Sequence, residues 1–138
     1  MVLIVGGVYQ GKLAYALERF GLSEEDVYFC DDSSTDIPIG KKIVYEIDKW
    51  FLALLKANKN VSDALTEFLS DCADYKGNSE DSVCAVICND ISCGVVPIDA
   101  TIRKWREETG RAMGRLAQGS DEVVRLFCSI PTVLSRTE

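Results

Sequence analysis

The fold is indicated first by one stretch near the start of the chain, Val2-Leu-Ile-Val-Gly-Gly-Val-Tyr-Gln-Gly-Lys-Leu13. An apolar, β-branched run is followed by glycines, and residues 11–20 then have the apolar spacing of an amphipathic helix. Gly6 and Gly11-Lys12 have the Gly-x4-Gly-Lys spacing of a phosphate-binding loop, in which backbone amides surround phosphates and the lysine reaches the outer ones. Such a loop has Ser or Thr next, whose hydroxyl binds Mg²⁺, whereas Leu13 occupies that position here.

Further apolar runs alternate with helical patterns along the rest of the chain. The runs predict strands, several of them covered on both faces as in a parallel sheet, and the alternation predicts right-handed crossovers between them. We therefore expect one domain, residues 1–138, with a three-layer, doubly wound α/β fold, a mostly parallel sheet of about five or more strands, and an architecture like that of P-loop NTPases. The predicted strands are residues 2–5, 27–30, 43–47, 83–88 and 123–128, and the predicted helices are 11–20, 48–57, 61–73 and 100–117.

The composition limits the classes of partner. Hydrophobic residues make up 47% of the 138 residues and charged residues 27%, as in an average globular domain. The formal net charge of −7 opposes polyanions, so we expect no nucleic-acid and no membrane partner. A nucleotide stays compatible with this charge, because a helix N-terminus and a local cation can hold its few phosphates. The start lacks signal-peptide features and no run approaches the ~20 apolar residues of a membrane span, which predicts a cytoplasmic protein.

The cysteines are predicted to be structural. If residues 83–90 form a strand, Cys84 and Cys88 lie about 13 Å apart along it, too far to share a zinc ion or a disulfide. Buried free thiols are the simplest interpretation for the cysteines in or beside apolar runs. These are Cys30, Cys84, Cys88, Cys93 and Cys128.

Polar side chains follow several predicted strands. Asp31-Asp32, Glu46 with Asp48, and Asn89-Asp90 would meet at the carboxyl edge of a parallel sheet, where such sheets bind ligands. Two readings stay open, because acidic groups suit a phosphate chain with its divalent cation, and because turns favour Asp and Asn. Glu46 and Asp48 are the candidate Mg²⁺ ligands, since residues two apart point to the same face of an extended strand.

Two glycines interrupt the last predicted helix. Gly110 and Gly114 lie one turn apart, and each costs a helix up to about 1 kcal/mol relative to Ala. We expect the close approach of a backbone or a ligand to compensate for this cost.

The segment Asn89-Asp-Ile-Ser-Cys-Gly-Val-Val-Pro97 resembles the Asn-Glu-Val-Gly-x-Gly-Ile-Val-Pro segment of the adenosylcobinamide kinase/adenosylcobinamide-phosphate guanylyltransferase family. The glycine loop matches the family's Gly-Gly-x-x-x-Gly-Lys-Ser in position, and Glu46 resembles the glutamate that ends a central strand there. Further residues fall where the family has the same residue types, namely Arg103, Arg106, Gly110, Arg111, Arg115, Leu116 and Ala117.

The resemblance implies a kinase that uses ATP or GTP with Mg²⁺ to phosphorylate a primary hydroxyl of a corrinoid side chain. Lys12 and Glu46 would be catalytic, Glu46 and Asp48 would hold the cation, and the protein would be a homo-oligomer such as a trimer. The family transfers guanylyl groups through a histidine, and this chain has none, so that second activity is not expected. A nucleotide- or corrinoid-binding module without turnover, with a regulatory or assembly role, is the alternative. The implied nucleotide-binding residues are Gly6, Gly7, Val8, Tyr9, Gln10, Gly11, Lys12 and Leu13.

Overall fold

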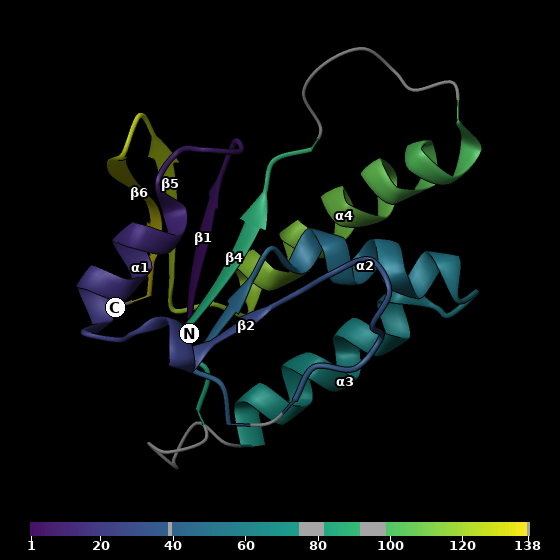
Figure 1. Ribbon diagram of the computed structural model, residues 1–138, viewed down its shortest axis with the longest axis horizontal. Helices are drawn as coiled ribbons and strands as arrows, with labels where there is room; N and C mark the ends of the chain where they lie inside the picture. Colours follow the sequence, from purple (N-terminus) through teal and green to yellow (C-terminus); the bar gives the residue numbers. More distant parts are fainter. Residues whose placement is uncertain (39, 75–81, 92–98, 138) are drawn as a thin grey trace.

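The computed structural model describes residues 1–38, 40–74, 82–91 and 99–137 and has an α/β fold (Figure 1). Strands and helices alternate through most of the chain, as the sequence predicts. In chain order the elements are β1 (Val2–Gly6), α1 (Lys12–Phe20), the 3₁₀ turn η1 (Glu24–Asp26), β2 (Val27–Phe29), β3 (Ile43–Tyr45), α2 (Ile47–Lys56), α3 (Val61–Asp74), β4 (Ala85–Asn89), α4 (Ala100–Gln118), β5 (Glu122–Phe127) and β6 (Ile130–Arg136).

The strands form a six-stranded sheet in the order β2-β3-β4-β1-β5-β6. Strands β1 to β5 run parallel to one another, and in the described part of the chain β6 alone is antiparallel, paired with β5. The predicted mostly parallel sheet is therefore confirmed. Strand β1 lies between β4 and β5, so the glycine loop that follows it leaves the middle of the sheet at its carboxyl edge.

Strand β6 is the element that the sequence analysis missed. All seven of its residues are exposed, so its sequence has no continuous apolar run, and it contains Pro131. It follows β5 through the two-residue turn Cys128-Ser129, whose φ values of 51° and 62° are those of a tight hairpin. Neither residue is glycine, which is why the usual sequence signal of such a turn is absent.

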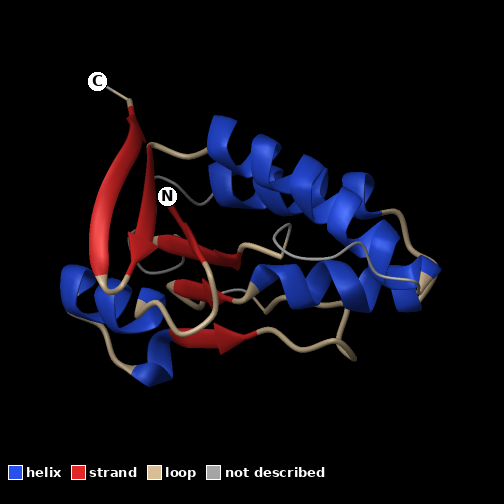
Figure 2. Ribbon diagram, turned by 90° about the horizontal axis from the view of Figure 1, so that it is seen from above, coloured by secondary structure: helices blue, strands red, loops and turns tan. Residues whose placement is uncertain are grey.

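Helices cover both faces of the sheet (Figure 2). Alternate residues of β1 point to opposite sides: Val2 and Ile4 pack in the cluster that includes α1, and Leu3 and Val5 pack in the cluster with α2, α3 and α4. Burial on both sides explains the continuous apolar runs in the sequence. Among the residues that the structure describes, no helix is long and apolar enough to cross a bilayer.

The cysteines follow the prediction in part. Cys30 and Cys88 are buried free thiols, and burial raises the pKa of Cys30 to about 12. Cys84 is only half-buried before β4, and Cys128 is exposed because it lies in the hairpin turn, so the predicted burial is wrong for these two residues. Cys93 lies outside the described residues.

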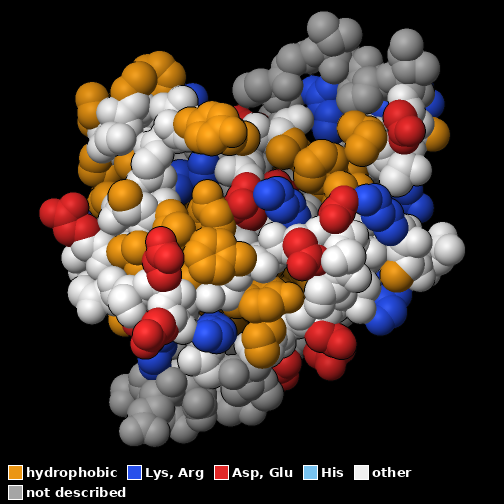
Figure 3. Space-filling view, viewed as in Figure 1, with side chains coloured by type: hydrophobic (Ala, Val, Ile, Leu, Met, Phe, Trp, Pro, Cys, Tyr) orange, Lys and Arg blue, Asp and Glu red, His pale blue; other side chains and the backbone are white. Residues whose placement is uncertain are grey.

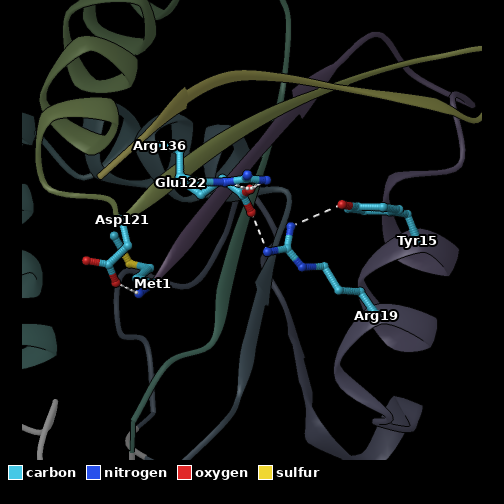
Figure 4. A network of polar contacts seen from close by, with 6 residues as sticks. All are labelled: Met1, Tyr15, Arg19, Asp121, Glu122 and Arg136. Atoms are coloured by element: carbon cyan, nitrogen blue, oxygen red, sulfur yellow. Dashed lines mark hydrogen bonds and ion pairs between the residues drawn. The ribbon is translucent and has the colours of Figure 1, made fainter. Parts of the chain in front are cut away.

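A polar network ties the amino edge of the sheet to α1 (Figure 4). The side chain of Glu122 on β5 is only 6% exposed, and its Oε1 accepts hydrogen bonds from Arg136 Nε at 2.9 Å and Nη2 at 2.7 Å. Its Oε2 contacts the guanidinium of Arg19 on α1, which also donates to the Tyr15 hydroxyl at 3.0 Å. Hydrogen bonds from Arg136 and then Arg19 lower the pKa of Glu122. One carboxylate thus connects α1, β5 and β6.

Replacing Glu122 by Gln should lower the free energy of unfolding at pH 7 by about 1 to 2 kcal/mol, because two guanidinium groups lose their anionic acceptor. Since the folded-state pKa of Glu122 lies below its unfolded value, this stabilisation is complete above the unfolded pKa and is lost as the pH falls through the folded one. Urea denaturation at pH 7 and at pH 3 measures both effects. The exposed Glu107→Gln is the control, and an equal loss in the two variants would contradict the assignment.

Candidate functional site

The glycine loop between β1 and α1 packs against the β5–β6 hairpin. Gly6 has φ 154°, and a Cβ placed on it would lie 2.5 Å from the carbonyl oxygen of Leu126. Gly11 has φ 82°, and its Cβ would lie 2.7 Å from Ser129 Oγ. Gly6 is therefore required by the close approach of the β5 backbone, and Gly11 is favoured by its positive φ, reasons that the phosphate-loop spacing alone did not indicate.

The start of α1 supplies partial positive charge at this loop. Gly11 is the N-cap residue, no side chain makes a capping hydrogen bond, and the first turn contains no acidic residue. The first amides of a helix have no acceptor within the helix, and the helix dipole adds positive potential at the same end. This end of α1 therefore suits an anion.

Lys12 folds back onto the loop that precedes it. It is only 4% exposed, and its Nζ donates a hydrogen bond to the carbonyl oxygen of Gly7. Burial lowers the pKa of Lys12, whereas the nearby carboxylates of Asp48 and Glu46 act in the opposite direction. The ammonium group is thus a desolvated cation between the loop and two acidic side chains, as the predicted role requires, but it already has a partner in the loop itself.

Asn89, at the end of β4, joins the two acidic side chains. Its Nδ2 donates to Glu46 Oε2 at 2.7 Å and to Asp48 Oδ2 at 3.3 Å, and its backbone N–H donates to Asp48 Oδ1 at 3.0 Å. It is buried and lies in register with Gly6 on β1. From the sequence, Asn89 is one of several polar residues that follow predicted strands, and this connecting role is not indicated. The sequence feature that could have singled out Asn89 is its position directly after a continuously apolar run.

The predicted strand geometry of Glu46 and Asp48 is wrong. Strand β3 ends at Tyr45, because Glu46 is in the left-handed region with φ 60° and forms the N-cap of α2. Asp48 then lies in the first turn of α2 rather than two residues along a strand. The two carboxylates nevertheless meet, since both accept hydrogen bonds from Asn89. Lys49 Nζ contacts the other Glu46 oxygen at 3.1 Å.

The carboxylates of Glu46 and Asp48 differ in how well they could bind a cation. The side chain of Glu46 is 17% exposed, so one carboxylate can meet a hydrated Mg²⁺, which usually keeps waters and phosphate ligands. Asp48 is 1% exposed, burial raises its pKa, and both its oxygens accept from Asn89, which suits a supporting role. The described residues contain no group of three or more His, Cys, Asp or Glu side chains that could hold a metal. Magnesium binding stays a prediction that rests on Glu46.

A cleft of about 640 Å³ contains these groups. It is lined by residues 8–11 of the loop, by residues 12–14 in the first turn of α1, and by Glu46, Asp48 and Asn89. Trp105 on α4 lines the cleft as well, and its Nε1 donates to the backbone oxygen of Asp48 at 2.6 Å. The structure therefore brings residues 8–13, Glu46 and Asp48 together, whereas the predicted Gly6 and Gly7 do not line the cleft. Residues 92–98, which carry part of the family resemblance, lie outside the described residues.

Hydrophobic side chains are exposed at the tip of the β5–β6 hairpin and at the tip of the glycine loop (Figure 3). Tyr9 is 99% exposed and Val8 is 52% exposed on the loop. Phe127 and Ile130 flank the hairpin turn and are 64% and 65% exposed. Of these four residues, Val8 and Tyr9 line the cleft.

Searches with models of known protein families and against curated protein sequences found no match to this chain. The resemblance to the adenosylcobinamide kinase family therefore rests on the quoted motifs. The geometry of the cleft is a second observation, independent of those motifs, that bears on function.

The loop glycine Gly6 and the helix glycine Gly110 should respond in opposite ways to replacement by alanine. Gly6→Ala should lower the free energy of unfolding by about 3 kcal/mol, because the methyl group meets the Leu126 carbonyl and the backbone is strained. Among the described residues nothing lies within 4 Å of a Cβ built on Gly110 or Gly114, so no backbone approaches these glycines closely, and the approach of a ligand stays a prediction. Gly110→Ala should accordingly raise stability by up to about 1 kcal/mol. Chemical denaturation of both variants checks this, and destabilisation by Gly110→Ala would contradict it.

Proposed function

We propose that this chain is a nucleotide-dependent kinase of the adenosylcobinamide kinase type, with a P-loop NTPase-like fold. It would transfer the terminal phosphoryl group of ATP or GTP to a primary hydroxyl of a corrinoid side chain. The observation that supports this is the convergence, in one cleft, of a buried lysine at an uncapped helix start with a linked pair of carboxylates.

The binding step uses the glycine loop and α1. Backbone amides of residues 6–13 would face the phosphates, and the Lys12 ammonium would exchange its bond to Gly7 for a phosphate oxygen. An anionic partner stabilises the charged form of a desolvated lysine, so binding would raise the lowered pKa of Lys12. The position of the loop supports the proposal, because open α/β sheets bind ligands at the carboxyl ends of their strands.

The transfer step would depend mainly on positioning and electrostatics. Glu46 lies across the cleft from the loop and would accept a hydrogen bond from the attacking hydroxyl. Asn89 holds the Glu46 carboxylate in place, and buried Asp48 in turn holds Asn89. Glu46 is also the residue that would hold Mg²⁺, which when bound supplies charge neutralisation at the phosphates.

A second function is favoured by Leu13 and by the Lys12–Gly7 contact. Leu13 packs with the apolar cluster beneath α1 and offers no oxygen to a cation. The lysine already has an acceptor within the loop. Both observations suit a module that binds a nucleotide or a corrinoid without turnover and serves regulation or assembly.

Thermal denaturation with ATP or GTP, with and without Mg²⁺, tests nucleotide binding. We expect the wild-type melting temperature to rise with ligand, and Lys12→Met to lose this shift because the cation in the cleft is removed. The exposed Lys104→Met is the matched control and should keep the shift. If no nucleotide shifts the wild type, the kinase and the nucleotide-binding form of the module are both wrong.

Mass spectrometry of cobinamide incubated with the wild type and nucleotide then separates the two functions. The kinase predicts a phosphorylated product that is lost in Glu46→Gln. Binding of nucleotide without any phosphorylated product would support the module instead.

Leu13→Ser should increase Mg²⁺-dependent nucleotide affinity, because it introduces the hydroxyl that phosphate loops direct at the cation. Stability should fall, since an apolar contact under α1 is lost. Leu13→Ala is the matched control, as it removes the same contact without adding a hydroxyl. Calorimetric titration with and without Mg²⁺ measures the difference, and equal affinities in the two variants would mean that the loop does not hold phosphate in the expected way.

A further inference from the structure

The tip of the glycine loop is hydrogen-bonded to the hairpin turn between β5 and β6. The side-chain Oε1 of Gln10 accepts from the backbone N–H of Cys128 at 2.5 Å. The backbone oxygen of Gln10 accepts from the N–H of Ser129 at 3.2 Å. One loop residue thus satisfies both amides of the two-residue turn.

The hairpin contacts both ends of the loop. The Leu126 carbonyl occupies the space where Gly6 would carry a side chain, and Ser129 Oγ does the same at Gly11. Gln10 lies between these two glycines and adds the polar contacts. The shape of the loop is therefore set by its contact with β5 and the turn as well as by its own glycines.

The hairpin is itself anchored at its other end. Arg136 pairs with Glu122 at the end of the hairpin that is farthest from its turn, and the two side chains form an ion pair. Glu122 also contacts Arg19 on α1 (Figure 4). Helix α1 is the element that begins at the loop. The hairpin therefore contacts α1 near its last turn through Glu122 and contacts the loop before α1 through its own turn.

We propose that Gln10 is a positioning residue that holds the glycine loop against the β5–β6 hairpin in its phosphate-binding shape. This inference rests on the proposed nucleotide binding and gives the Gln10 side chain a role that the glycine-lysine spacing does not indicate. Gln10 acts through the backbone of the loop, and its own side-chain acceptor is directed at Cys128. A loop held before the ligand arrives loses less conformational freedom on binding, which increases affinity.

The test compares ATP binding by calorimetry in the wild type, Gln10→Met and Gln118→Met. Gln10→Met keeps the length of the side chain and removes its acceptor, and the Kd should rise about fivefold to tenfold, the value of one hydrogen bond. The melting temperature without ligand should change little, because Gln10 is half-buried and the pairing of β5 with β6 stays. The same change at exposed Gln118 should leave the Kd unaltered.

Hydrogen exchange of the Cys128 amide, measured by NMR, gives a readout that a general loss of stability would not mimic. The amide should be protected in the wild type and should exchange faster in Gln10→Met, whereas neighbouring β5 amides keep their protection. Gln10→Glu retains a side-chain acceptor of the same length, so it should restore protection of this amide.

The outcomes separate the two proposals. Wild-type affinity in Gln10→Met, or unchanged exchange at Cys128, overturns the positioning role and leaves nucleotide binding intact. A wild type that binds no ATP overturns the proposed function and this inference together.

Discussion

The close approach of β5 to the end of β1 is the constraint on which the site depends. The Leu126 carbonyl lies where the side chain of any residue other than glycine would stand at position 6, and Gly11, beside Ser129, has a φ of 82° that favours glycine. The loop follows β1, so it leaves the sheet at the carboxyl edge between two parallel neighbours. Gly6 is in register with Asn89 of β4, which places the start of the loop beside that residue. Glu46 and Asp48 reach the same cleft from the start of α2.

Burial of the charged side chains in the cleft has a desolvation cost. A buried lysine and a buried aspartate each lose hydration, which lowers the pKa of one and raises that of the other. The amide of Asn89 reduces this cost, since it donates to both carboxylates and keeps the two like charges in one arrangement. Buried ionisable groups of this kind contribute little net stability and are common where a ligand is bound. The cluster is therefore easier to understand as a binding site than as a part of the core.

Sequence reasoning predicted the fold more fully than the site. Strands β1 to β5 and all four helices were located from apolar periodicity, because each buries a continuous run or a stripe. Strand β6 was missed because an exposed edge strand has no such pattern, and its turn lacks glycine. In the site, Lys12, Glu46 and Asp48 were named from spacing and strand ends. The roles of Asn89 and Gln10 were not, since their partners lie 41 or more positions away in the sequence.

The sequence by itself determined an alternating α/β fold with a glycine loop after its first strand, because hydrophobic periodicity and glycine spacing depend only on residues that are close together in the chain. Tertiary structure alone decided the left-handed turn at Glu46, the buried bond between Lys12 and Gly7, and the contact of the loop with the hairpin. These features depend on which strands are neighbours and on how closely their backbones approach. Sheet order is a property of the whole packed core, so no local pattern of residues specifies it.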